Sequence, residues 1–319
     1  MKIFKIVMIT IVSLGILFIT LGLIIGGSFI GVIDIFNQSD EYEKQDTIYF
    51  DQEITSIYMD LETRNIQIIS SDESQITIDY YEKEGDTWDI TLNQGVLSIE
   101  HEEEKGIFNW FNLGFIEQDV KTIIIMIPYT YQFDMDVETN TGDVSVKNFD
   151  QDNHLGEVLI ESNTGDVSMD TVFANHVEME TDTGSIKVKH ATMQSLDMET
   201  DTGDIIIDDV VVEKNIEAES STGSTSVNNV TAQSISVVMH TGDIDVEDVT
   251  IDQIDLKTNT GDIEVVGVDL LNRTINLSTS TGDVEFDGHE QGKTYTYVGS
   301  LENYYIVAKT NTGDIEIND

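Results

Sequence analysis

The stretch Thr241-Gly242-Asp243-Ile244-Asp245-Val246-Glu247 decides the fold, because it joins a tight corner to a strand with one apolar face. Its apolar residues Ile244 and Val246 alternate with acidic residues, and this period of two is typical of a half-buried β-strand. The alternation continues through Ile254 and Leu256 to the next Thr-Gly pair at Thr260. Each unit of about 19 residues is therefore expected to contain two or three short strands.

The Thr-Gly pair recurs nine times, and successive glycines are 23, 19, 19, 20, 19, 19, 21 and 31 residues apart. Glycine supplies a positive φ or lets two backbones approach closely. The flanking Asn, Asp and Ser residues favour turns through local hydrogen bonds. We therefore assign a structural turn role to Gly142, Gly165, Gly184, Gly203, Gly223, Gly242, Gly261, Gly282 and Gly313.

The repeats predict an all-β fold, a β-solenoid of about 19-residue Thr-Gly-Asp units. A unit this short cannot bury its apolar face alone, whereas stacked units bury it continuously. Successive coils would lie about 4.8 Å apart, the spacing of neighbouring strands in a sheet. Pro128 is the only proline, as expected where every backbone N–H is needed for pairing.

The N-terminus predicts a transmembrane signal anchor. Lys2 and Lys5 precede an uncharged run of 28 residues from Ile6 to Ile33, and about 20 residues suffice to span a bilayer. Acidic residues follow the run, so the positive-inside rule places the N-terminus in the cytoplasm and the repeats outside the cell. The alternatives are a long signal peptide and a buried helix.

These patterns divide the chain into an anchor with its cytoplasmic N-terminus (1–33), a linker (34–46), degenerate repeats with a cap (47–131) and regular repeats (132–319), with an insertion near 287–308. Residues 107–116 interrupt the pattern with an aromatic cluster, which is either a cap or an exposed contact loop. The insertion contains Tyr295, Tyr297, Tyr304 and Tyr305 and is expected to be a hairpin.

The chain has 61 acidic and 15 basic residues among 319, a formal net charge of −46, and no cysteine. Such a surface repels phosphate backbones, which excludes nucleic acid as a partner. The absence of cysteine excludes disulfides, thiol catalysis and zinc-thiolate sites. Because the acids alternate with apolar residues, the charge predicts the solvated outer surface of a folded rod.

Carboxylates are the only potential ligand groups that occur at high density in the sequence. After Gly242, the outward positions of three repeats are almost all acidic, and three coils of aligned acids would attract cations. The candidate metal ligands are Asp243, Asp245, Asp262, Glu264, Asp283 and Glu285. Calcium, which takes six to eight oxygen ligands, is the possible ion. The alternative is a solvated face whose aspartates accept local N–H groups. No other cofactor is expected.

The sequence favours no catalytic residue. The six histidines show no metal-ligand spacing, and His240 occupies a corner position filled elsewhere by Asn, Asp or Ser. No GxSxG motif, P-loop or dinucleotide fingerprint is present. We therefore expect that the protein is not an enzyme.

The N-terminal anchor, the apolar strand from Ile123 to Pro128 and the Thr-Gly-Asp units together resemble a family of bacterial β-strand-repeat proteins described as candidate adhesins of unknown function. The chain is similar to the membrane-anchored LiaG-type proteins of envelope-stress operons in Gram-positive bacteria. The resemblance covers residues 45–319 and implies architecture more than role, since the family offers no catalytic residues to transfer.

The sequence thus predicts a non-catalytic, membrane-anchored extracellular solenoid, an adhesin or stress-accessory module that meets a protein or glycan at the cell surface. A self-assembling envelope scaffold is the alternative, with open solenoid ends that pair edge to edge. A carbohydrate-active β-helix enzyme is the third possibility.

Overall fold

A computed structural model describes residues 42–103 and 122–319 of the chain. The predicted membrane anchor and the aromatic segment 107–116 lie outside these residues. Within the described part, no helix is long and apolar enough to serve as a membrane span. Residues 44–319 form one compact unit.

The N-terminal strands are β1 (Glu43–Lys44), β2 (Ile48–Phe50), β3 (Ser56–Thr63), β4 (Asn65–Ser71), β5 (Ile76–Asp79), β6 (Tyr81–Glu82), β7 (Thr87–Asn93), β8 (Val96–Glu102) and β9 (Thr122–Pro128). The regular repeats supply β10 (Asp134–Thr141), β11 (Val144–Phe149), β12 (Leu155–Thr164), β13 (Val167–Val172), β14 (Ala174–Thr183), β15 (Ile186–Met193), β16 (Ser195–Thr202), β17 (Ile205–Val212), β18 (Asn215–Thr222), β19 (Thr225–Thr241), β20 (Ile244–Glu247), β21 (Thr250–Thr260) and β22 (Ile263–Val266). The C-terminal strands are β23 (Thr274–Thr281), β24 (Val284–Phe286), β25 (His289–Gly292), β26 (Thr294–Tyr297), β27 (Tyr305–Thr312) and β28 (Ile315–Ile317).

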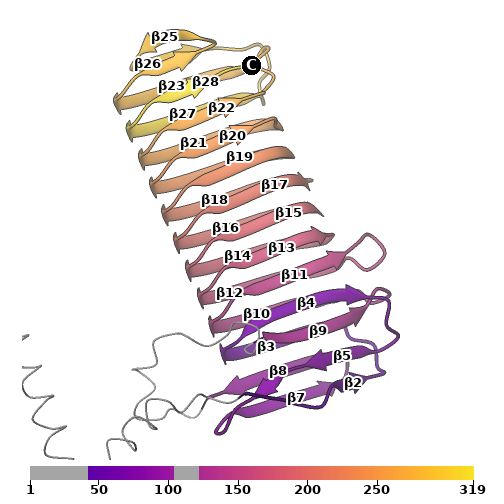
Figure 1. Cartoon of the computed structure of the whole chain (residues 1–319). Helices are drawn as coiled ribbons and strands as arrows, with labels where there is room; N and C mark the ends of the chain where they lie inside the picture. The colour runs from indigo at the N-terminus through magenta and orange to yellow at the C-terminus, as the bar shows by residue number, and fades with distance from the viewer. Residues whose placement is uncertain (1–41, 104–121) are drawn as a thin grey trace, which may run out of the picture. The chain divides into compact units, whose positions relative to one another are not determined.

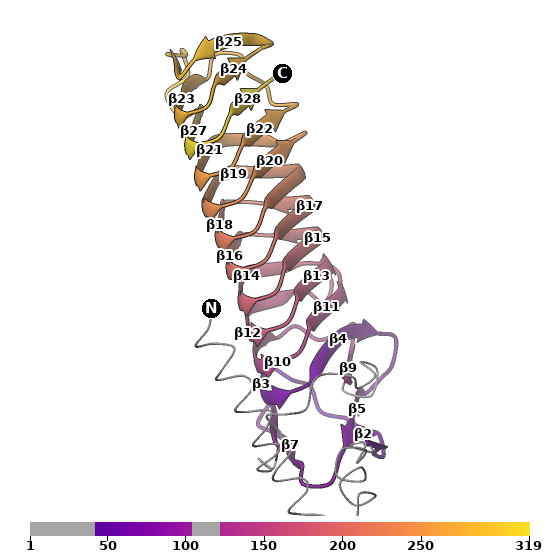
Figure 2. The same cartoon turned by 60° about the vertical axis from the view of Figure 1, so that its left-hand side comes forward.

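The predicted β-solenoid is confirmed, and its coils stack along one axis (Figure 1). Strands that precede each Thr-Gly corner pair in parallel in one row, in the order β8-β3-β10-β12-β14-β16-β18-β19-β21-β27-β23. Strands that follow the corner form a second parallel row, β9-β4-β11-β13-β15-β17-β19-β20-β22-β28-β24 (Figure 2). The long strand β19 contributes its first part to the second row and its last part to the first.

The coils at both ends are threaded out of sequence order. The coil of β3 and β4 comes first in the chain, yet it lies between the coil of β8 and β9 and that of β10 and β11. At the other end, the last coil, β27 and β28, lies between β21–β22 and β23–β24. The coils that come first and last in the sequence therefore each have a parallel neighbour on both sides.

Antiparallel strands cover the outermost coils. At the N-terminal end β7 pairs with β8, β5 pairs with β9, and β2 pairs with β5. At the C-terminal end β26 pairs with β23 and β25 pairs with β24. Because an unpaired parallel edge is a template for association with another chain, these strands protect the stack.

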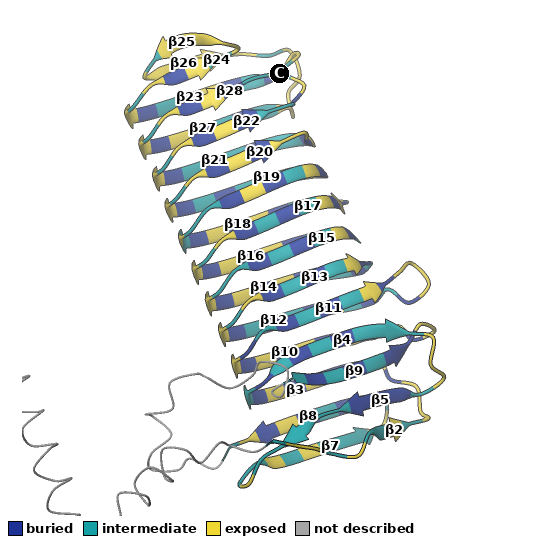
Figure 3. Cartoon of the chain, viewed as in Figure 1, coloured by how far each residue is buried: buried dark blue, intermediate teal, exposed yellow. Residues whose placement is uncertain are grey.

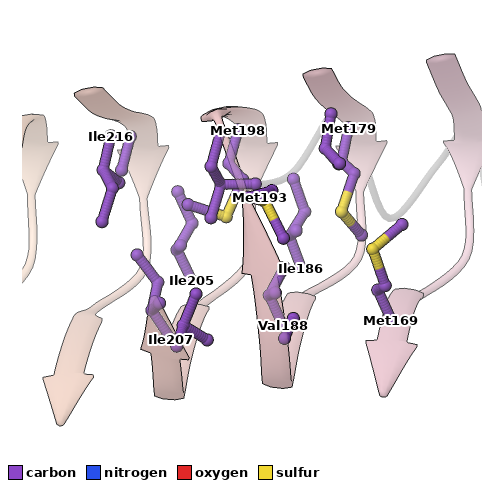
Figure 4. Close-up of a cluster of buried hydrophobic side chains, with 14 of the residues drawn as sticks. Met169, Met179, Ile186, Val188, Met193, Met198, Ile205, Ile207 and Ile216 are labelled. Carbon is purple, nitrogen blue, oxygen red and sulfur yellow. The ribbon is translucent and has the colours of Figure 1, made fainter. Parts of the chain in front are cut away.

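The core runs the length of the stack between the rows, where apolar side chains alternate with exposed ones along each strand (Figure 3). In the middle coils, Met169, Met179, Met193 and Met198 pack with isoleucine and valine from neighbouring coils (Figure 4). Burial of one such side chain stabilises the fold by about 1.5–3 kcal/mol. The repeat is thus stable only as a stack.

The Thr-Gly corner requires glycine for two reasons. The nine glycines have φ between 139° and 158°, which L side chains rarely adopt. A Cβ at Gly203 would also lie 1.8 Å from the carbonyl oxygen of Gly184 in the preceding coil. The column of glycines therefore allows the coils to stack at the strand spacing.

A second corner lies about six residues after each signature glycine. Its residues adopt left-handed conformations: Asn148, Thr171, His190, Asp209, Asn229, Asp248, Gly267 and Asp287 have φ between 49° and 70°. Asn, Asp and Gly tolerate this region well, whereas Thr171 is β-branched and His190 is bulky. After this column, neighbouring coils pair again over a few residues, as Ala191 does with Val210 and Met193 with Val212.

Candidate functional site

The predicted metal ligands lie on the coils after Gly242, and three of them take part in one backbone ladder at the Thr-Gly corner. Asp243 Oδ1 accepts the N–H of Asp262 at 2.8 Å, and Asp262 Oδ1 accepts the N–H of Asp314 at 2.7 Å. Asp314 Oδ1 then accepts the N–H of Asp283 at 2.8 Å. Because the last coil is inserted here, Asp314 separates two residues that the sequence predicts to be neighbours.

The other three predicted ligands are Asp245, Glu264 and Glu285, and a residue of the inserted last coil again separates two of them. Asp245 is in register with Glu264, Glu264 with Glu316, and Glu316 with Glu285. Burial and the charges of Asp243 and Asp262 raise the pKa of Asp245 above its ordinary value.

The corner hydrogen bond is not special to the acidic coils. Asn65 Oδ1 accepts the N–H of Asp143 at 3.0 Å, and Asp143 Oδ1 accepts the N–H of Asp166 at 2.9 Å. Asp166 and Asp204 do the same for Ser185 and Ser224, each at 2.8 Å. The aspartate of the signature therefore links successive coils along most of the stack by a direct hydrogen bond. Calcium binding at the six predicted residues stays a prediction.

A longer row of acids, which sequence reasoning missed, lies on the strands that precede the Thr-Gly corner. Seven carboxylates are in register across adjacent strands from β8 to β18: Glu100, Asp60, Glu138, Glu161, Glu180, Glu199 and Glu219. We call this set the carboxylate ladder. Its sequence signal is a glutamate four residues before the signature glycine in five successive repeats. In later repeats the same position is occupied by Val238, Lys257 and Ser278.

The ladder is electrostatically strained. Burial, reinforced by Asp60 and Glu161, raises the pKa of Glu138. Burial, reinforced by Glu199 and Glu161, likewise raises the pKa of Glu180. Two unit charges about 5 Å apart repel by about 1 kcal/mol even in water. A ladder of this length therefore forms a strongly negative strip along one face of the rod.

A groove of about 520 Å³ lies on the same row of strands, beside the ladder. Its acidic lining comes from Asp134, Asp136, Glu157, Glu178 and Asp197. Burial and neighbouring glutamates raise the pKa of Asp197. The groove thus widens the negative strip across the first row.

A serine and a histidine within this groove approach the spacing of a catalytic pair. His176 Nδ1 lies 2.5 Å from Ser195 Oγ, and His176 Nε2 lies 3.9 Å from Glu157 Oε1. The Glu157 side chain is 71% exposed, so it does not hold the imidazole in a fixed orientation. The strand of Ser195 is paired on both sides, so its ladder N–H groups are not available as oxyanion donors. The pair supports hydrogen bonding between coils better than nucleophilic catalysis.

A buried charged cluster lies at the N-terminal end, where Arg64 occupies the corner position that glycine fills in later coils. Its guanidinium contacts Asp86 Oδ2 and donates to Glu103 Oε1 at 2.7 Å. Lys83 Nζ lies 3.2 Å from Glu103 Oε2, and His101 Nε2 lies 3.6 Å from Asp86 Oδ2. The Arg64 guanidinium also lies 5.6 Å from the centre of the Trp88 ring.

Among the described residues, Asp86, His101 and Glu103 are the acid and histidine group whose possible ligand atoms lie within 4.8 Å of one another. None of the six predicted metal ligands belongs to it. Arg64 and Lys83 already pair with these carboxylates, so a divalent cation would have to enter beside two positive charges. Burial would raise the pKa of Asp86, but His101, the Lys83 N–H and Arg64 together lower it. The cluster is therefore a buried ion-pair network.

Three solved structures are similar to this chain at low sequence identity. A solved structure named "putative adhesin" from Bacteroides fragilis is 14% identical, covers 87% of this chain and 98% of its own, and has a TM-score of 0.44. A "putative lipid binding protein" from Parabacteroides distasonis is 11% identical, covers 86% and 96%, and has a TM-score of 0.46. A "putative cell adhesion protein" from Clostridium sporogenes is 11% identical, covers 87% and 99%, and has a TM-score of 0.26.

No curated protein matches the sequence. The family model of the Toastrack domain, DUF4097, matches residues 54–318, which include nearly every strand of the solenoid. The chain therefore belongs to the Toastrack DUF4097 family.

Proposed function

We propose that the chain is a non-catalytic module of the cell envelope, anchored by its N-terminal apolar segment, that displays the solenoid outside the cell for a protein or glycan partner. The observation that supports this proposal is the closure of both ends of the stack by antiparallel strands. The capping strands leave no open parallel edge at which the coil stack of another copy could continue directly. The long side faces remain as the surface for a partner.

The charge of the side faces defines the chemistry of that partner. The carboxylate ladder and the acids of the groove make the first row negative over many coils, while the lysines in ion pairs lie mostly on other strands. A partner with basic groups at regular intervals complements such a strip, and its association would be fast and salt-sensitive. A basic protein segment satisfies this requirement better than a neutral glycan.

The membrane topology is tested by introducing single cysteines, because the chain has no cysteine of its own. Gln151, in an exposed turn, is replaced by cysteine and treated with a membrane-impermeant maleimide on intact cells. We expect Gln151→Cys to react at once. Lys5→Cys should react only after permeabilisation, and the buried control Val167→Cys only after denaturation. Labelling of Lys5→Cys instead of Gln151→Cys on intact cells would refute the proposal.

The partner surface is tested by crosslinking on intact cells. Changing Glu161, Glu180 and Glu199 to glutamine removes three charges from the ladder. A matched control changes Glu247, Glu264 and Glu285, which lie on the other row. We expect a crosslinked partner with wild type and control, and its loss with the ladder variant. Equal loss in both variants would show that only the overall charge matters, and self-crosslinking alone would favour the scaffold.

A further inference from the structure

A pocket of about 340 Å³ opens at the C-terminal end of the stack, beside the strands that cap it. β26 covers β23 and β25 covers β24, beyond the last coils in Figure 1. Ile275 and Phe286 from the two rows, together with Tyr295 of the cap, line the space between them. The loop from Asp269 to Asn272 forms the remaining wall.

The apolar part of the lining is aromatic. The rings of Phe286 and Tyr295 stack with centroids 4.5 Å apart and an interplanar angle of 19°. Tyr297 and Leu271, which also line the pocket, are 47% and 74% exposed. Exposed apolar groups gathered in this way on a chain of net charge −46 indicate a binding site.

The charged part of the lining is entirely acidic. Asp269, Asp287 and Asp319 line the pocket, and no basic side chain does so among its described lining residues. Arg273, next to the lining residue Asn272, is engaged by the backbone: its Nε donates to the Asp269 carbonyl at 2.5 Å and its Nη1 to the Asp252 carbonyl at 3.0 Å. The pocket therefore offers negative charge and ring faces together.

We propose that this pocket binds a small organic ammonium ion, whose alkyl groups contact the rings of Phe286, Tyr295 and Tyr297 while its charge is balanced by Asp269 and Asp287. Aromatic faces attract such cations through the ring quadrupole, and carboxylates complement their charge. The volume of the pocket lies within the range of ligand pockets, about 300–1,000 Å³. This inference goes beyond the partner surface on the long faces and is tested separately.

The test measures binding of choline to the full chain in detergent micelles by saturation-transfer NMR, at constant ionic strength. The comparison ligand is 3,3-dimethyl-1-butanol, which has the shape of choline without its charge. Tyr297→Leu removes an exposed ring without changing the net charge. Asp287→Asn removes a charge at a residue with φ of 50°, a conformation that asparagine also tolerates.

We expect choline to bind and the neutral analogue to bind at least about fivefold more weakly, because the charge is part of the recognition. Tyr297→Leu should weaken choline binding about two- to fivefold, and Asp287→Asn should weaken it similarly. The controls Tyr129→Leu and Asp72→Asn, both exposed residues outside the pocket lining, should leave binding unchanged.

Equal binding of choline and its neutral analogue would overturn the proposal, as would the absence of choline binding to the wild type. Equal weakening by pocket and control variants would also overturn it, since general attraction by the acidic chain would then explain the binding.

Discussion

The carboxylate of Asp243 accepts the backbone N–H of Asp262 at 2.8 Å, so a corner side chain of one coil holds the backbone of the next. Asparagine can make the same bond, as Asn65 does for Asp143. We expect Asp243→Ala to lower the free energy of unfolding by about 1 kcal/mol, and Asp243→Asn to preserve it, because the acceptor remains and a repelling charge is lost. Urea unfolding of both variants checks this.

Glu264→Ala serves as the control for that experiment, because it removes a neighbouring charge that accepts none of these corner N–H groups. Equal stability losses in Asp243→Ala and Asp243→Asn would contradict the hydrogen-bonding role. A rise of the melting temperature in millimolar calcium that disappears when Asp243, Asp262 and Asp283 become asparagine would assign the row to cation binding instead.

The carboxylate ladder predicts that stability rises as the pH falls moderately. The folded state raises the pKa of Glu138 and Glu180 above 4.5 through burial and neighbouring acids. The folded protein therefore binds protons more readily than the unfolded chain, so stability increases as the pH falls through the raised pKa values. Melting temperatures from neutral pH toward pH 5 should rise, and added salt should reduce the difference.

Glu180→Gln separates the ladder from other acids in this experiment. The variant should melt above the wild type at neutral pH, and the gap should narrow as Glu180 of the wild type becomes protonated. At still lower pH both proteins should lose stability, because Asp86 and Glu103 have lowered pKa values in the folded state. A gap that is constant with pH would show that Glu180 contributes through packing rather than charge.

The second corner predicts a stabilising substitution. Thr171 has φ of 58°, whereas Asn148 and Asn229 occupy the equivalent position in other coils. A β-branched residue is strained there, and asparagine tolerates it. We expect Thr171→Asn to raise the free energy of unfolding by about 1 kcal/mol. Thr192→Asn, in a strand of ordinary φ, should bring no gain, and an equal gain in both would point to a cause other than backbone strain.

The Thr-Gly repeats were sufficient to predict the solenoid, because period-two alternation and a glycine column have few other solutions. They were not sufficient for the order of coils at the ends. The 31-residue gap before Gly313 shows that something is inserted there, but strand pairing in space decides that β27 lies between β21 and β23. Asp314 and Glu316 were therefore missed as members of the acidic row.

The carboxylate ladder and the Arg64 cluster escaped prediction for different reasons. The ladder has a local signal, glutamate four residues before the glycine, which becomes visible when the repeats are aligned on the corner. The cluster brings together Arg64, Asp86 and Glu103 from separate connections, and no periodicity relates them. Only the threading of β3 beside β8 places them in contact.

The Arg64 cluster leads to the largest expected loss of stability. The side chains of Arg64 and Asp86 are 1% and 0% exposed, and Arg64 also pairs with Glu103. Removing one partner of a buried ion pair leaves an uncompensated charge, at a cost of about 3–5 kcal/mol. We expect Arg64→Met to lower the free energy of unfolding by this amount, and Arg64→Met with Asp86→Asn to recover part of it.

Lys187→Met is the matched control, because its ion pair with Asp166 is exposed and should contribute less than about 1 kcal/mol. Equal small losses in Arg64→Met and Lys187→Met would show that the buried network does not stabilise the N-terminal end of the stack.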